Sequence, residues 1–413
     1  MKYGRMGTLK RGILPKAAAA GVVLLCLLSG AGCHGSMPES KPVQAIEAAV
    51  EAVAPAVSLP QHYLPPQDVD YSLYEKPAVV AKGIYVSQAV ANSADIFPKR
   101  LDICNTTEVN AMVVDIKESD GLVTFNGISQ ADNLGLSINM IKDIRSFLQT
   151  LKENGVYRIG RIVVFKDNAI VEHYPDFGLR LADGTIFREK TSEGYGPAWL
   201  NPYNRDVWDY VLGIAKGAAE LGFDEIQFDY FRFPTSPKIA DAQFGDTGGL
   251  SKKEIITAFA QYAMEQLKPY GVKVSVDVYG TIILSDLDSG IIGQDYDSLC
   301  QIFDYVCPML YPSHFAPDTM EIDYPDLHPY DTIYKSLVHS NERLAKVPDV
   351  RAVIRPWLQD FTASYLKYSN IPWQEYNAPQ VREQIQAVYD AGLAQWLLWS
   401  SGGYNTVEAL LPE

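Results

Sequence analysis

The sequence predicts an α/β protein whose main part is a closed (β/α)8 barrel, the TIM-barrel architecture. Eight short apolar runs rich in β-branched residues alternate with helical stretches over about 320 residues, and such alternation is typical of a parallel sheet. The competing doubly wound sheet usually carries a glycine-rich phosphate turn after an early strand, and Lys82-Gly83-Ile84 is no such turn. Eight units of this size therefore favour the barrel.

The predicted elements follow from the apolar patterns. The predicted strands lie in residues 82–87, 111–117, 158–166, 222–234, 272–280, 305–311, 352–358 and 395–400. The predicted helices cover residues 96–105, 140–154, 205–221, 252–267, 332–344 and 378–391. Residues 167–204 contain enough Gly and Pro to exclude much regular structure. An ordered loop of this length is usually functional.

The N-terminal segment looks like a targeting signal outside the fold. A basic stretch precedes an apolar run over residues 17–28, and small residues then lead to Cys33. This resembles a bacterial lipoprotein signal in which Cys33 is lipidated, although Gly30 stands where such signals usually carry Leu. Ordinary secretory cleavage is the alternative. We therefore expect a signal over 1–33, a Pro- and Ala-rich linker over 34–78 and a barrel over 79–413, exported and lipid-anchored to the cell envelope.

Composition narrows the function classes. The formal net charge of -15 argues against nucleic-acid binding, because phosphate binding needs a basic surface. The spacing of Cys and His residues indicates no metal site, and we expect no cofactor. Cys300 and Cys307 could pair, but Cys307 falls inside a predicted strand and is better explained as a buried thiol.

The fourth predicted strand ends in charged residues. Ile226 and Phe228 share one face, while Gln227 and Asp229 share the other. Pro234 cannot donate to a strand ladder, so the strand should stop before it. A buried acid at the end of a strand costs desolvation energy unless the site uses it. We interpret Asp229 as the centre of an active site.

Two further acids should converge on Asp229, because active sites of such barrels lie at the C-terminal ends of the strands. Asp277 alternates with a row of valines that suits the helix layer, so Asp277 should point into the barrel. Asp115 has the same placement, with pairing to Lys117 or Arg161 as the structural alternative. Neighbouring carboxyl groups raise at least one pKa. A protonated acid beside a carboxylate is the equipment of glycoside hydrolysis.

Aromatic residues near the predicted strand ends strengthen this interpretation, since flat rings suit stacking on a sugar, although each ring alone is more often packing. The rings are Tyr85, Tyr230, Tyr279, Tyr311, Trp357, Trp399 and Tyr404.

We expect Arg232 to hold Asp229 or a neighbouring acid ionised rather than to contact substrate. The substrate-binding candidates are Tyr85, Asp115, Lys117, Tyr230, Arg232, Tyr279, Tyr311, His314, Trp357 and Trp399.

The stretch 223–234 resembles the signature of a bacterial glycosyl hydrolase domain family that is a distant relative of the α-amylase-like (β/α)8 hydrolases. Blocks at 82–85, 113–117, 275–280, 308–314 and 355–360 are similar to other parts of that family, so the resemblance spans about 82–404. It implies Asp229 as nucleophile and Asp360 as stabiliser. The usual strand-five Glu is absent, which leaves Asp277 as the candidate acid.

Three functions remain open at this stage. The first is a glycoside hydrolase acting on a polysaccharide or envelope glycan, with Asp229, Asp277 and Asp360 as catalytic candidates. The second is a carbohydrate-binding barrel without catalysis, supported by the missing Glu. The third is an envelope scaffold that binds proteins through residues 167–204. Fold alone decides none of these.

Overall fold

The computed structural model describes residues 79–191, 194–400 and 406–411. The predicted signal with Cys33, the linker 34–78 and Tyr404 lie outside these residues. Within the described ranges, no helix is both long and apolar enough to cross a membrane.

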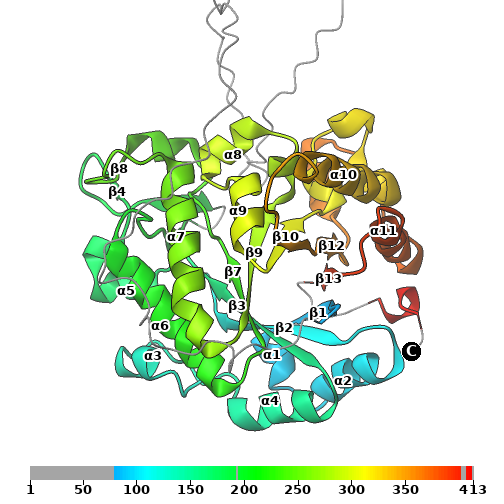
Figure 1. The fold of residues 1–413 in the computed structure, drawn as a ribbon, viewed down its shortest axis with the longest axis horizontal. Coiled ribbons are helices and arrows are strands. Elements are labelled where there is room, and N and C mark those ends of the chain that lie inside the picture. The colour runs from blue at the N-terminus through cyan, green and yellow to red at the C-terminus, as the bar shows by residue number, and fades with distance from the viewer. Residues whose placement is uncertain (1–78, 192–193, 401–405, 412–413) are drawn as a thin grey trace, which may run out of the picture.

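A closed parallel barrel forms the centre of the molecule (Figure 1). Neighbouring strands pair in parallel around the ring, and the pairing of β9 with β10 closes it. The strands are β1 (Lys82–Val86), β2 (Ala111–Lys117), β3 (Tyr157–Val163), β7 (Glu225–Asp229), β9 (Lys273–Tyr279), β10 (Tyr305–Met309), the pair β11 (Val353–Ile354) and β12 (Trp357–Gln359), and β13 (Trp396–Trp399). This confirms the predicted (β/α)8 barrel.

The seventh strand differs from its prediction as one continuous run over 352–358. It is divided into β11 and β12, and both parts pair with β10. Pro356 lies between them and has no N–H to donate to the ladder. The intervening Arg355 side chain is nevertheless fully buried.

Helices surround the barrel (Figure 1). They are α1 (Gln88–Ala91), α2 (Phe97–Thr106), α3 (Ser129–Asn133), α4 (Ile144–Glu153), α5 (Ala169–His173), α6 (Arg205–Leu221), α7 (Lys252–Leu267), α8 (Asp286–Ile292), α9 (Tyr296–Ile302), α10 (Pro329–Leu344) and α11 (Ala378–Asp390). The predicted bounds of α6 and α7 are confirmed. Asn204 caps the start of α6 and Gly222 ends it with a φ of 116°.

The segment between β3 and α6 is more regular than predicted. It contains α5 and the short strands β4 (Arg180–Leu181), β5 (Arg188–Thr191) and β6 (Gly194–Ala198). The hairpin of β5 and β6 is antiparallel, and β4 pairs with β8 (Ala242–Gln243). Gly and Pro therefore limit these elements to short lengths without preventing them, and β6 itself contains Gly194, Gly196 and Pro197.

Strand parity divides the core into two parts. Val274, Val276 and Val278 belong to the large apolar cluster between strands and helices. A smaller cluster inside the barrel contains Tyr85, Val113, Ile159, Cys307, Trp357 and Leu397. Cys104, Cys300 and Cys307 are free thiols, as expected for Cys307. Polar residues share the interior parity, so the barrel encloses charge at both ends of its strands.

Candidate active site

Arg161 lies at the centre of the charged group near the C-terminal ends of the strands. Its Nη1 donates to Asp115 Oδ1 at 2.6 Å, and its Nη2 donates to Asp229 Oδ2 at 2.5 Å. Its Nε donates to the same Asp229 oxygen at 3.1 Å. Although burial acts to lower the pKa of Arg161, the charges of Asp229 and Asp115 hold this pKa well above its ordinary value. The guanidinium therefore joins two acids from β2 and β7.

Asp115 is a supporting residue of this group. Its Oδ2 accepts a hydrogen bond from the Tyr85 hydroxyl, and its Oδ1 is bound to Arg161. The residue is 1% exposed. Pairing with Arg161, one of the two structural alternatives for Asp115, is therefore present. Tyr85 in turn stacks on Trp399 with ring centroids 4.2 Å apart.

Asp229 is the last residue of β7 and retains slight exposure, at 7%. The next residue, Tyr230, has a φ of 49°. Such a left-handed backbone is uncommon for a bulky residue and often marks a functional site. The turn brings the Tyr230 N–H to Asp229 Oδ1 at 2.5 Å. Asp229 is thus fixed by Arg161 on one side and by the backbone N–H of Tyr230 on the other.

Asp277 lies on the neighbouring strand in a different environment. The last paired residues of β7 and β9 are Phe228 and Val276, so one further step sets Asp229 beside Asp277. The Trp357 indole N–H donates to Asp277 Oδ1 at 2.8 Å. Burial, followed by the negative charge of Asp229, raises the pKa of Asp277 well above its ordinary value. The site therefore pairs a guanidinium-bound carboxylate with a carboxyl group that favours its protonated form.

Two cations and three aromatic rings form the rim beside Asp229. The Arg232 guanidinium carbon lies 5.0 Å from the ring centres of Trp199 and Tyr230 and 4.5 Å from that of Tyr279. Lys166 Nζ lies 4.9 Å from the Tyr230 centroid. The expectation that Arg232 holds Asp229 or a neighbouring acid ionised is wrong. Arg161 binds Asp229, and Arg232 forms no ion pair with a described acid, since its Nη1 donates to the Phe233 carbonyl at 2.9 Å.

Tyr311 and His314 continue the site beyond β10. Their rings meet edge to face at 5.1 Å, with Tyr311 buried and His314 exposed. Burial and the charges of Asp277 and Asp229 raise the pKa of Tyr311. Trp357 and Trp399 contact each other edge to face at 5.6 Å. These rings thus belong to the same end of the barrel as the acids.

Two predicted site residues have structural partners instead. Lys117 is fully buried, with its Nζ 2.8 Å from Asp167 and 2.7 Å from the Val163 carbonyl oxygen. A register shift between Asp115 and Lys117 interrupts the alternation that would have pointed Lys117 into the barrel. Asp360 accepts hydrogen bonds from Thr406 N at 3.1 Å and Oγ1 at 2.6 Å. Both side chains are buried and bound to other groups of the protein.

Sequence reasoning missed Arg161, Lys166 and Glu118 as site residues. Glu118 directly follows β2, and burial and the charge of Asp115 raise the pKa of Glu118. All three stand at or beyond the middle of their strands, near the C-terminal ends. That position is the signal that could have identified them.

In the part of the chain that the structure describes, no group of three or more His, Cys, Asp and Glu side chains is arranged to hold a metal ion.

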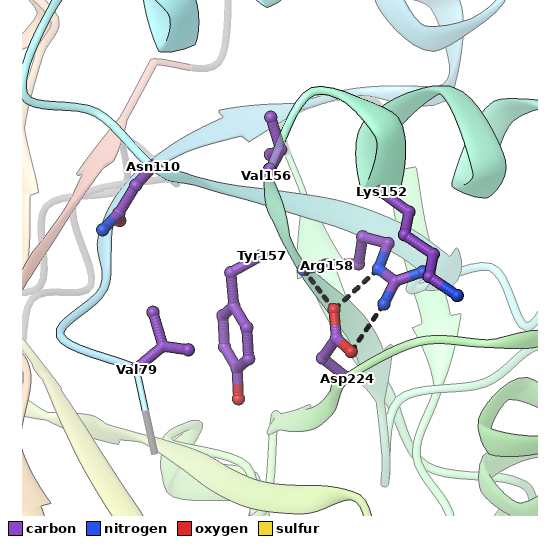
Figure 2. Close-up of a pocket in the computed structure, with 8 residues that line it drawn as sticks. Val79, Asn110, Lys152, Val156, Tyr157, Arg158 and Asp224 are labelled. Carbon is purple, nitrogen blue, oxygen red and sulfur yellow. Dashed lines mark hydrogen bonds and ion pairs between the residues drawn. The ribbon is translucent and has the colours of Figure 1, made fainter. Parts of the chain in front are cut away.

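A hollow lies at the opposite end of the barrel. Its volume is about 380 Å³. Figure 2 shows Val79, Asn110 and Tyr157 at its border. The Arg158 side chain binds Asp224 through two bonds of 2.6 Å. The cavity lies where the strands begin, and in such barrels residues at that end usually serve stability. The acids described above make the C-terminal end the candidate active site.

Comparison with known proteins identifies the family of the chain. A family model described as "Putative glycosyl hydrolase domain" matches residues 83–404. No curated protein matches the chain. Among solved structures, a hypothetical protein from Ruminiclostridium thermocellum is 38% identical, with 47% of this chain and 97% of that chain covered and a TM-score of 0.42.

Two other solved structures share the fold. The PgaB (BpsB) glycoside hydrolase domain from Bordetella bronchiseptica is 13% identical, with a TM-score of 0.57 and coverage of 79% of this chain and 95% of that chain. The α-L-fucosidase isoenzyme 2 from Paenibacillus thiaminolyticus is 14% identical, with a TM-score of 0.50 and coverage of 80% and 49%. Since the family model spans most of the sequence and nearly all of the barrel, the chain belongs to this glycosyl hydrolase domain family.

Proposed function

We propose that the chain is a glycoside hydrolase that cleaves a glycosidic bond in a polysaccharide or cell-envelope glycan. Asp229 acts as nucleophile or charge stabiliser, and Asp277 acts as general acid and base. The observation that carries this proposal is the difference between two neighbouring acids: Arg161 binds Asp229, while burial and the charge of Asp229 raise the pKa of Asp277. Carboxyl groups with opposed protonation states are what glycoside hydrolysis requires.

The supporting rings suit a carbohydrate. Tyr230, Tyr279 and Trp399 are partly exposed at the same end of the barrel as Asp229. A sugar ring has apolar faces that pack on aromatic side chains and polar edges that need hydrogen-bond partners. Under this proposal Asp360 does not act as the third catalytic acid, since Thr406 occupies its carboxylate.

The test is reducing-sugar release from a panel of bacterial cell-wall and extracellular polysaccharides. Wild type should release sugar, while Asp229→Asn and Asp277→Asn should each lose at least about a hundredfold in turnover, the lower end for positioned acid–base groups. Asp102→Asn, on the exposed face of α2, is the matched control. Unchanged turnover in Asp229→Asn would show that Asp229 is not a catalytic residue.

A binding barrel without catalysis is the second candidate. Asp277 is only 2% exposed and is bound to Trp357, whereas a general acid must reach the glycosidic oxygen. A glycan array separates the two functions. Glycan binding that persists in both Asn variants, together with no release by wild type, would favour the binding barrel.

We also propose that Cys33 carries a lipid that anchors the protein to the cell envelope. The support is the sequence pattern of residues 1–33. In cell fractionation, Cys33→Ala should move the protein out of the membrane fraction. Cys104→Ala, a free thiol of the barrel, is the control and should leave the distribution unchanged.

A further inference from the structure

Lys166 and Arg232 form a pair of cations on the rim of the candidate site. Both side chains lie about 5 Å from the centre of the Tyr230 ring, so the two charged centres are at most about 10 Å apart. Arg232 is 6% exposed and Lys166 is partly buried. Like charges held together at a partly buried site repel each other and lose hydration.

The neighbouring acids do not fully compensate these cations. Among the described residues, Arg232 has no carboxylate within ion-pair distance, and its one hydrogen bond goes to the Phe233 carbonyl. Glu189 Oε2 lies 3.7 Å from Lys166 Nζ, which is too long for a hydrogen bond. Asp229 is already bound by Arg161. The cationic pair thus retains capacity for an additional anion.

The electrostatic effects within the rim agree with this geometry. Burial and the positive charge of Arg232 lower the pKa of Lys166, while Glu189 and Asp229 oppose that change. An anion bound between Lys166 and Arg232 would relieve their repulsion. Guanidinium and ammonium groups are the usual protein ligands of carboxylate, sulfate and phosphate groups.

We propose that Lys166 and Arg232 form a subsite for an acidic sugar residue, one that bears a carboxylate or an ester of sulfate or phosphate. The partly exposed rings of Tyr230 and Tyr279 contact the sugar face, and the two cations bind its acidic group. The subsite lies next to Asp229, so the acidic residue occupies a position adjacent to the bond to be cleaved. This inference rests on the proposed function and names its substrate class.

Binding is tested apart from hydrolysis, by ligand-detected NMR on the full-length Asp229→Asn protein at low ionic strength. The probes are D-glucuronate, D-galacturonate, glucose 6-sulfate and glucose 6-phosphate, with D-glucose and D-galactose as neutral parents. At least one acidic sugar should bind about tenfold more tightly than its parent, and the preferred probe identifies the acidic group. No preference for any of the acidic probes would overturn the proposal.

Three variants locate the effect. Lys166→Met should abolish the preference without changing the affinity for the neutral parent. Lys152→Met, at the opposite end of the barrel, should leave the preference intact. Glu189→Gln removes the competing carboxylate and should raise the affinity for the acidic probe about threefold. A preference that survives in Lys166→Met would overturn the proposal.

The outcome is separable from that of the proposed function. A protein that hydrolyses neutral glycans and shows no acidic preference would retain the function and lose the subsite. A protein that binds acidic sugars through Lys166 but hydrolyses nothing would retain the subsite and lose the enzyme.

Discussion

Two arginine–carboxylate clusters lie inside this barrel, one toward each end of its strands. Near the N-terminal ends, Arg355 binds Glu225, whose other contacts are the Ser275 hydroxyl at 2.5 Å and the Tyr157 hydroxyl at 3.1 Å. Near the C-terminal ends, Arg161 binds Asp115 and Asp229. Residue types and strand parity are alike in the two clusters.

The clusters differ in access and in charge balance. Arg355 and Glu225 have no exposed surface, whereas the side chains of Arg161 and Asp229 are each 10% exposed. We call the Arg355–Glu225 cluster the inner cluster and the Arg161–Asp115–Asp229 cluster the outer cluster. Within the described residues the inner cluster matches one cation with one acid. The outer cluster brings Asp277 beside Asp229, which is already paired with Arg161. The outer cluster is therefore the catalytic candidate, because it reaches solvent and contains an acid with a raised pKa. The inner cluster has neither property and is interpreted as structural. The following predictions test that distinction.

The largest expected effect is on the inner cluster. Arg355→Met leaves Glu225 as an uncompensated buried charge and should cost about 3–5 kcal/mol of folding free energy. Urea unfolding measures this loss. Arg355→Met combined with Glu225→Gln should recover most of it, because replacing both partners removes the buried charge. A single variant as stable as wild type would contradict a structural role for the pair.

The same substitution in the outer cluster should cost less stability and more function. Arg161→Met leaves Asp115 and Asp229 without their shared donor, at a cost of about 1–3 kcal/mol, since water can partly replace the lost bonds. Glycan binding and hydrolysis should fall, whereas they should persist in the folded fraction of Arg355→Met. Arg145→Met, on the exposed face of α4, is the control for both. If Arg161→Met and the folded fraction of Arg355→Met lost equal amounts of glycan binding and hydrolysis, the two clusters would not differ in function.

The sequence predicted this arrangement only where a local pattern determines it. Alternation along single strands placed Asp229 and Asp277 on the interior face, and the structure agrees. The partner of each acid depends on neighbouring strands, which explains why Arg232 was chosen in place of Arg161. The bulge after Asp115 likewise has no signature in the run that ends at Lys117, and the contact of Asp360 with Thr406 joins distant segments.

Asp277 should make folding stability depend on pH. Its raised pKa means that the folded protein keeps a proton which the unfolded chain releases above about pH 4. Stability should therefore fall by up to about 1.4 kcal/mol per pH unit from there up to the folded pKa. Asp277→Asn should flatten this decline, while Asp102→Asn should not. An unchanged decline in Asp277→Asn would show that another group is responsible.

The smallest expected effect concerns the single hydrogen bond to Asp277. The Trp357 N–H favours the ionised form, so it opposes the rise in the pKa of Asp277. Trp357→Phe should therefore raise that pKa further, by about 0.7 unit for a bond of about 1 kcal/mol. Carboxyl-carbon NMR titration measures the shift without a substrate, and the alkaline limb of any pH–rate profile should move upward with it.

Trp208 offers a matched control for this bond. Its indole N–H donates to the Pro202 carbonyl at 2.8 Å, so Trp208→Phe loses a bond of the same length outside the acid pair. That variant should lower stability without moving the Asp277 titration. If Trp357→Phe also left the titration unchanged, burial and Asp229 alone would hold the proton on Asp277. The outer cluster would then differ from the inner one by its spare acid and its access to solvent, with no tuning by the indole.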